Sequence, residues 1–259
     1  MKKICLYYFS GTGMTNYIID RLSSEFKKHH IFVDCFKIEE VDAHHATLSE
    51  YDALGIAYPT HSLNAPKLVI DFAKKLPQSE GMNTFIIYTC SANSPANYAS
   101  SSLLIKKLSK RGYRVFYDKL IEMPSNFAHK LGQQAVLRTL DKANKDIPHI
   151  ADEIVELKAH FMENGTRSKI LTSLARAEWI GAPIMGKFFA ATSDCTRCGK
   201  CVEQCPTKNI VMKKKSVGFK WRCGLCMRCV YQCPEHAIKV RQPFKFISLD
   251  SWYDSELFK

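Results

Sequence analysis

The chain reads Cys195-Thr-Arg-Cys198-Gly-Lys-Cys201-Val-Glu-Gln-Cys205-Pro206, and 28 positions later it reads Cys223-Gly-Leu-Cys226-Met-Arg-Cys229-Val-Tyr-Gln-Cys233-Pro234. Both runs have the spacing C-x2-C-x2-C-x3-C-P, and together they hold eight of the 11 cysteines. An isoleucine follows each run at the same offset, at Ile210 and Ile238. One small unit is therefore duplicated in this part of the chain.

The spacing of the cysteines predicts two iron–sulfur cubes. Three thiolates at i, i+3 and i+6 can hold three corners of a cube, while the cysteine before the proline reaches the other cube. Cluster I then takes Cys195, Cys198, Cys201 and Cys233, and cluster II takes Cys223, Cys226, Cys229 and Cys205. Over roughly residues 190–241 the chain resembles the bacterial two-cluster ferredoxins.

Two other chemistries use many cysteines. Structural zinc favours two pairs of Cys-x-x-Cys and leaves the middle cysteine of each triplet unused. A disulfide framework belongs to short secreted chains, and this chain has 259 residues. Both alternatives explain the pattern less completely than two [4Fe-4S] clusters do.

The first part of the chain alternates between apolar runs and helical patterns. Such alternation predicts an α/β fold with a doubly wound, five-stranded parallel sheet that is covered on both faces. The expected strands are residues 3–9, 31–38, 53–58, 84–90 and 113–121, and the expected helices are 15–29, 66–76, 97–111 and 131–162.

The loop after the first expected strand indicates a phosphate site. It reads Ser10-Gly11-Thr12-Gly13-Met14-Thr15-Asn16, with three hydroxyls and a row of backbone N–H groups where a helix begins. A nucleoside triphosphate loop needs a Lys that is missing here, and a dinucleotide loop needs Gly where Asn16 stands. The Ser-x-Thr-x-x-Thr spacing resembles the flavodoxin loop that holds the phosphate of FMN.

The resemblance to flavodoxins also implies where the flavin ring lies. The ring is expected on the loops after the third and fourth strands, at the carboxyl edge of the sheet. Tyr58 or His61 is then a candidate to stack on the ring, although Tyr58 can equally be the last inward strand residue and His61 an exposed loop imidazole. The expected ring contacts are Tyr58, Pro59, Thr60, His61 and Asn64 on one loop and Thr89, Cys90, Ser91, Ala92 and Asn93 on the other.

The net charge of +12 is concentrated around the cysteines. Between positions 194 and 245 there are twelve Lys and Arg but only three acids. Two all-thiolate cubes, at about −2 each, reduce that excess of nine to roughly +5. The remaining basic face fits an acidic redox partner or is simply solvated. Nucleic-acid binding is not expected, because the cations are not interleaved with an aromatic platform.

Four regions follow from these patterns. We expect a flavodoxin-like FMN domain at residues 1–163, a connector helix at 164–190, a small ferredoxin-like α+β domain with two [4Fe-4S] clusters at 191–241 and an unassigned tail at 242–259. The apolar stretch 169–191 is interrupted by charges, Gly and Pro, so it predicts a domain connector and no membrane span, with a membrane-surface contact as the alternative. The free thiols and the short apolar run after Lys3 indicate a cytoplasmic protein.

The combination resembles the ferredoxin–flavodoxin fusion proteins of anaerobic bacteria. It implies an intracellular electron-transfer protein that passes electrons between a redox partner protein, two [4Fe-4S] clusters and FMN. The alternative is an FMN-dependent reductase of a small organic substrate or quinone, although no acid/base pair besides His61 is legible near the flavin loops. No catalytic residue is assigned, and the sequence leaves the oligomeric state open, a dimer included.

Overall fold

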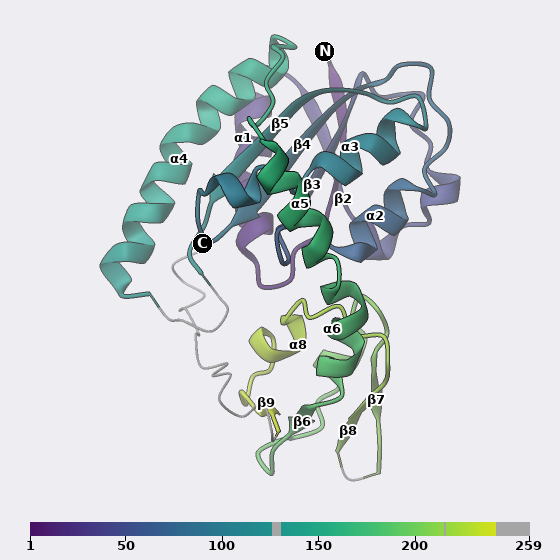
Figure 1. Cartoon of the computed structure of the whole chain (residues 1–259), viewed down its shortest axis with the longest axis vertical. Helices are drawn as coiled ribbons and strands as arrows, with labels where there is room; N and C mark the ends of the chain where they lie inside the picture. Colours follow the sequence, from purple (N-terminus) through teal and green to yellow (C-terminus); the bar gives the residue numbers. More distant parts are fainter. Residues whose placement is uncertain (126–130, 215, 242–259) are drawn as a thin grey trace. The chain divides into compact units, whose positions relative to one another are not determined.

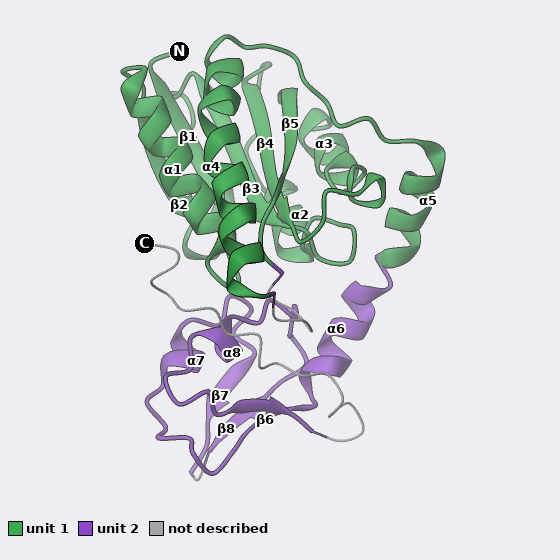
Figure 2. Cartoon of the chain, turned by 90° about the vertical axis from the view of Figure 1, so that its left-hand side faces the viewer, with its two compact units in different colours: residues 1–124, 132–175 green, residues 125–131, 176–259 purple. Residues whose placement is uncertain are grey.

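The computed structural model describes residues 1–125, 131–214 and 216–241. The chain forms two compact units (Figure 2). Unit 1 comprises Met1–Pro124 and Gly132–Ala175, and unit 2 comprises Ser125–Leu131 and Arg176–Lys259. The boundary at 175/176 falls inside the segment that was expected to be one connector. The expected tail at 242–259 lies outside the described residues.

Unit 1 contains the predicted five-stranded parallel sheet (Figure 1). The strand order β2-β1-β3-β4-β5 is the flavodoxin-like doubly wound order, so the predicted fold class is confirmed. All four pairings are parallel, which places the carboxyl ends of the strands at one edge. The strands are β1 (Lys3–Tyr8), β2 (Phe32–Lys37), β3 (Ala53–Pro59), β4 (Asn83–Cys90) and β5 (Arg114–Glu122).

Helices cover both faces of this sheet. The helix α1 (Met14–Lys28) packs against α4 (Gln133–Val155) on one face, and α2 (Lys67–Ala73) packs against α3 (Ser102–Ser109) on the other (Figures 1 and 2). The strands β1, β3 and β4 are almost wholly buried between these layers, which is why they read as continuous apolar runs. Three short 3-10 turns complete the unit: η1 (Ile38–Glu40), η2 (Ala43–His45) and η3 (Pro95–Asn97).

The helix expected at 131–162 ends earlier, at Val155. Leu157 adopts a left-handed φ of 55°, and the chain then runs extended beside β5, where the His160 carbonyl accepts from the Asp118 amide at 2.9 Å. Because these residues give their backbone hydrogen bonds to the sheet, the helical pattern cannot continue through them.

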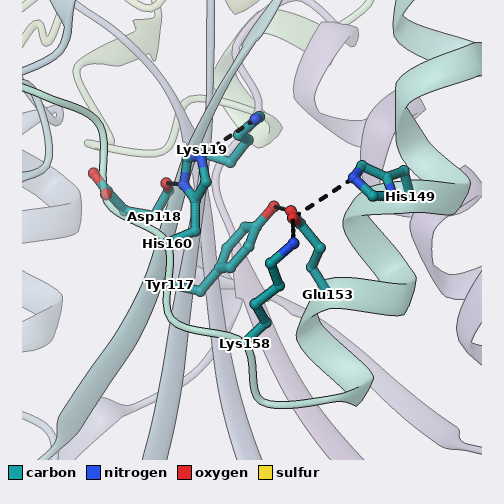
Figure 3. Close-up of polar contacts among 7 residues, drawn as sticks. All are labelled: Tyr117, Asp118, Lys119, His149, Glu153, Lys158 and His160. Carbon is teal, nitrogen blue, oxygen red and sulfur yellow. Dashed lines mark hydrogen bonds and ion pairs between the residues drawn. The ribbon is translucent and has the colours of Figure 1, made fainter.

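A polar cluster joins the extended segment that follows α4 to the sheet (Figure 3). Glu153 of α4 accepts from the Tyr117 hydroxyl at 2.9 Å and from Lys158 at 2.7 Å, and His149 lies 3.6 Å from the same carboxylate. The His160 ring bonds the Asp118 carbonyl at 2.9 Å. The route of the chain from α4 to the next helix, α5 (Thr166–Ala175), is thereby fixed within unit 1.

Unit 2 is a small α+β structure with an internal repeat. It begins with α6 (Glu178–Gly186). Antiparallel pairs join β6 to β9 and β7 to β8, so each pair takes one strand from either half of the repeat. The remaining elements in the described residues of unit 2 are β6 (Phe189–Ala191), α7 (Lys200–Glu203), β7 (Ile210–Met212), β8 (Val217–Phe219), α8 (Arg228–Tyr231) and β9 (Ile238–Val240).

The helices α5 and α6 divide the apolar stretch 169–191 between the two units. Throughout the described part of the chain, no helix is both long enough and apolar enough to cross a membrane.

Candidate functional site

The eight repeat cysteines line two separate cavities in unit 2. Cys195, Cys198, Cys201 and Cys233 face the first cavity, and Cys205, Cys223, Cys226 and Cys229 face the second. The cavities are of similar size, about 340 and 370 Å³ including space open to solvent. In the described residues no three Cys, His, Asp or Glu side chains form a group that could hold one metal ion. Four cysteines around a cavity fit a cube that fills the space between them.

The backbone of each cysteine loop repeats with the same 28-residue offset as the sequence. Left-handed φ angles occur at Arg197 and Leu225, at Gly199 and Met227, and at Lys208 and His236. Gly199 and Met227 stand directly before the helical turns α7 and α8. The two loops therefore present their cysteines through the same sequence of turns.

Backbone amides donate to the cysteine sulfurs at matching positions. The Asn209 amide lies 3.1 Å from the Cys205 sulfur, and the Ala237 amide lies 3.2 Å from the Cys233 sulfur. In addition, the Leu225 amide donates to Cys223 at 3.4 Å. Such bonds stabilise thiolates and tune the reduction potential of a cluster. The sequence did not identify these donors, because every residue except proline has a backbone amide.

Burial disfavours the thiolate form of three cysteines in the two cavities. It raises the pKa of Cys201 to about 11 and that of Cys226 to about 12, and it raises the pKa of Cys229 well above the usual range. These three thiols therefore hold their protons at neutral pH when no metal is bound. A coordinated metal reverses this preference, because it deprotonates a bound thiol outright.

The end of α6 packs closely on a cysteine of the second cavity. A Cβ atom added to Gly186 would lie 2.1 Å from the Cβ of Cys223 and 2.8 Å from its sulfur. Only glycine permits this approach. In contrast, Gly181 of the same helix has nothing within 4 Å of such an atom. The helix α6 thus supports the second cysteine cavity as well as leading into unit 2.

The predicted phosphate loop lies between β1 and α1 in unit 1. Gly13 precedes the helix with a left-handed φ of 103° and has no side chain that could cap it, and the first turn of the helix contains no acid. The Ser10 hydroxyl accepts from the Gly13 amide at 3.2 Å and from the Asn16 amide at 3.3 Å. A helix N-terminus with converging N–H groups and hydroxyls fits a phosphate monoester.

One residue among the predicted phosphate contacts, Thr15, also makes a hydrogen bond outside the loop. Thr15 is buried, and its hydroxyl lies 3.0 Å from the hydroxyl of Thr89, at the end of β4. This hydrogen bond ties the phosphate loop to one of the predicted flavin-ring loops. It also occupies a hydroxyl that the motif offered to the phosphate, whereas Ser10 and Thr12 remain only partly buried.

The loop after β3 forms a tight turn at the carboxyl edge of the sheet. His61 and Asn64 exchange backbone hydrogen bonds of 2.9 and 2.8 Å across Ser62 and Leu63, which both have positive φ. The His61 ring is partly buried, and its centroid lies 6.3 Å from that of Phe9 in an edge-on arrangement. Pro59 and Thr60 are partly buried as well.

Tyr58 lies in the core and not at the expected flavin-stacking position. Its side chain is completely buried, and its ring stacks on Tyr88 with centroids 5.8 Å apart and an interplanar angle of 11°. Both faces of β3 are covered by helices, so a residue near its end is buried on either face, as in the alternative interpretation made from the sequence. No surface of the ring is left for a flavin.

The loop after β4 presents three exposed small residues, Ser91, Ala92 and Asn93. Its first residue, Cys90, donates its thiol to the Ala92 carbonyl at 2.8 Å. Burial raises the pKa of Cys90 to about 12, so the group remains a thiol at neutral pH. The polar surface that this loop offers to a ligand therefore consists of backbone groups, Ser91 and Asn93.

The helix α5 contacts the loop after β3 and the turn η3, which the sequence did not reveal. The Asn64 side-chain amide donates to the Thr172 carbonyl at 2.8 Å, and the Ser168 hydroxyl donates to the Ala96 carbonyl of η3 at 3.4 Å. Asn64, Ser168 and Thr172 are all buried. The sequence signal for this packing is the pair of small polar residues at i and i+4 of α5, Ser168 and Thr172.

A family model for a 4Fe-4S dicluster domain matches residues 187–234. The chain therefore carries such a domain, as the cysteine spacing predicted. No curated protein matches the chain.

Several solved structures resemble unit 1. Flavodoxin 2 from Bacillus cereus is 18% identical, with a TM-score of 0.47, and the match covers 60% of this chain and 98% of that one. A flavodoxin from Streptococcus pneumoniae is 15% identical over 60% of this chain and 99% of its own, with a TM-score of 0.45. General stress protein 14 from Treponema denticola, solved with FMN, is 11% identical over 61% of this chain and 100% of its own, with a TM-score of 0.43.

Proposed function

We propose that this chain is an electron-transfer protein that holds two [4Fe-4S] clusters and one FMN and exchanges electrons with a redox partner protein. The observation that carries the proposal is the presence of two four-cysteine cavities and a Ser/Thr/Gly loop at the start of α1 in one chain. The 4Fe-4S dicluster match supports the first half of it. This organisation corresponds to that of the ferredoxin–flavodoxin fusion proteins of anaerobic bacteria.

Different residues of unit 1 bind the phosphate and the ring of FMN in this proposal. In this proposal the amides of the phosphate loop and the hydroxyls of Ser10 and Thr12 hold the phosphate, and the loops 59–65 and 89–93 contact the ring. Bound FMN takes up one or two electrons, while each cluster carries one. Thr15, Asn64 and Thr172 position these loops relative to one another through their hydrogen bonds.

A second function, reduction of a small organic substrate or quinone at the flavin, is favoured by one observation. The loops 59–65 and 89–93 contain no Phe, Tyr or Trp, and Tyr58 is withdrawn into the core. These two loops offer no aromatic side chain besides His61 to cover a ring face, which leaves room at the loops for a substrate or for an electron-transfer partner.

Electron transfer and substrate reduction are separated by one experiment. The anaerobic protein is photoreduced and then mixed with small quinones and other organic oxidants, with and without a redox protein. We expect reoxidation to be fast only with the redox protein. Repeated turnover of a small molecule without any protein partner would instead establish the reductase.

The crossed arrangement of ligands predicts which cluster each cysteine supports. We expect Cys205→Ala to produce the same change in the electron paramagnetic resonance spectrum as Cys226→Ala, because both line the second cavity. The Cys198→Ala variant should alter the other set of signals. If Cys205→Ala instead matched Cys198→Ala, each repeat would hold its own cube and the assignment would be wrong.

The contact between α6 and Cys223 predicts a selective effect of a single methyl group. We expect Gly186→Ala to displace Cys223 and lower the iron content or the cluster's resistance to air, because the added Cβ overlaps that side chain. The Gly181→Ala variant is the matched control, and its iron content should equal that of the wild type. Equal iron content and air stability in both variants would contradict the supporting role of α6.

The phosphate loop predicts different outcomes for its two threonines. Thr12→Val should weaken FMN binding and leave the unfolding temperature of unit 1 nearly unchanged. Thr15→Val should also destabilise the unit, by about 1–3 kcal/mol, because it leaves the buried Thr89 hydroxyl without its partner. Flavin fluorescence on dilution and thermal unfolding measure the two effects. FMN affinity unaffected in Thr12→Val would tell against this loop as the phosphate site.

A further inference from the structure

A tryptophan is exposed beside the second cysteine cavity. Trp221 is 62% exposed and stands between two exposed cations, Lys220 and Arg222. The three residues connect β8 to Cys223, the first cysteine of the second triplet. Tryptophan is enriched at the centres of protein–protein interfaces, where a polar rim surrounds it.

The internal repeat shows that the fold does not require this tryptophan. At the offset of 28, residues 220–222 correspond to Thr192, Ser193 and Asp194, which lead to Cys195. The backbone is held in the same way in both loops, since Lys220 donates to the Asn209 carbonyl at 2.7 Å and Thr192 to the Ala237 carbonyl at 2.8 Å. Ser193 therefore stands in the first loop, residues 192–194, at the position that Trp221 occupies in the second loop, residues 220–222.

The loop of residues 220–222 makes contacts that the corresponding loop, residues 192–194, lacks. The buried side chain of Asn209 accepts a hydrogen bond from the Arg222 amide at 2.7 Å, whereas the equivalent residue, Ala237, has no side-chain acceptor. The Lys187 ammonium lies 4.8 Å from the centre of the Trp221 ring and donates to the Phe219 carbonyl at 2.8 Å. The ring is thus held in place without being buried, which lowers the entropic cost of binding a partner.

The charges around the ring indicate the chemistry of the partner. Unit 2 contains 16 Lys and Arg against seven Asp and Glu, and Lys220 and Arg222 place two of these cations directly beside the ring. Unit 1 has 21 Lys and Arg against 18 Asp and Glu, so it is not an acidic counterpart within the chain. Charge complementarity therefore favours a separate, acidic protein.

We propose that the loop of residues 220–222 is the docking site for an acidic redox partner protein, with Trp221 as the anchor and Lys220 and Arg222 as the steering cations. This inference rests on the proposed electron-transfer function and locates its entry point at the second cluster. A partner seated on Trp221 lies two residues along the chain from a cysteine of that cavity. Electrons then enter or leave through the second cluster before the first.

The test measures electron transfer from a small acidic ferredoxin with one [4Fe-4S] cluster, photoreduced before mixing with the complete, cluster-loaded protein. We expect Trp221→Ala to lower the second-order rate constant about tenfold, and Trp221→Phe to restore much of the loss. Lys220→Ala should lower the rate constant less but reduce its dependence on ionic strength. Ser193→Ala, at the repeat position, and Lys214→Ala, an exposed cation of the β7–β8 hairpin, are the matched controls and should behave like the wild type.

Three results would overturn the docking site. The rate constant of Trp221→Ala could equal those of the two controls, or Lys214→Ala could change the salt dependence as much as Lys220→Ala does. Alternatively, Trp221→Ala could slow the exchange of electrons between clusters and flavin within the chain and leave the bimolecular rate unchanged. Iron content and cluster spectra of every variant show whether unit 2 is intact. Clusters that accept no electrons even from photoreduced deazaflavin would refute the electron-transfer function itself.

Discussion

Each half of the cysteine repeat contributes its last cysteine to the cavity of the other half, and the rest of unit 2 depends on this exchange. Three cysteines on one tight loop reach only three corners of a cube, so the fourth ligand has to come from elsewhere. In the structure Cys233 joins the first triplet and Cys205 joins the second. The paired strands repeat this exchange, since β6 pairs with β9 and β7 with β8. Neither half can close its cavity or complete its sheet alone.

In unit 1 the corresponding constraint is the parallel sheet. Parallel strands bring the loops after β1, β3 and β4 to one edge, where the predicted phosphate loop and two polar loops lie. Hydrogen bonds between the loops refine this arrangement, because Thr15 is joined to Thr89 and Asn64 to Thr172. The polar cluster around Glu153 holds the chain on the path that brings α5 to these loops. The edge is therefore organised by hydrogen bonds between protein groups.

Patterns with a fixed spacing could be predicted from the sequence. Period, offset and motif predict how the eight cysteines divide between two cavities. They also predict the five strands and the strand-loop-helix start of unit 1. Residues whose role depends on tertiary packing could not. Tyr58 lies near the end of a strand beside the expected ligand, but both faces of β3 are covered and its ring is completely buried. The helix α5 reads as a connector because nothing local shows that Thr172 meets Asn64. The role of Asn209 depends on a hydrogen bond from the amide of Arg222, 13 residues along the chain, which Ala237 at the repeat position cannot accept.

The central claim is that one chain holds two cubes and one flavin, and cofactor analysis of protein purified without oxygen tests it most directly. The account predicts about eight iron atoms, about eight acid-labile sulfides and about one FMN per chain. Half that iron, zinc in its place, or a protein that retains no flavin after anaerobic reconstitution with FMN would contradict it.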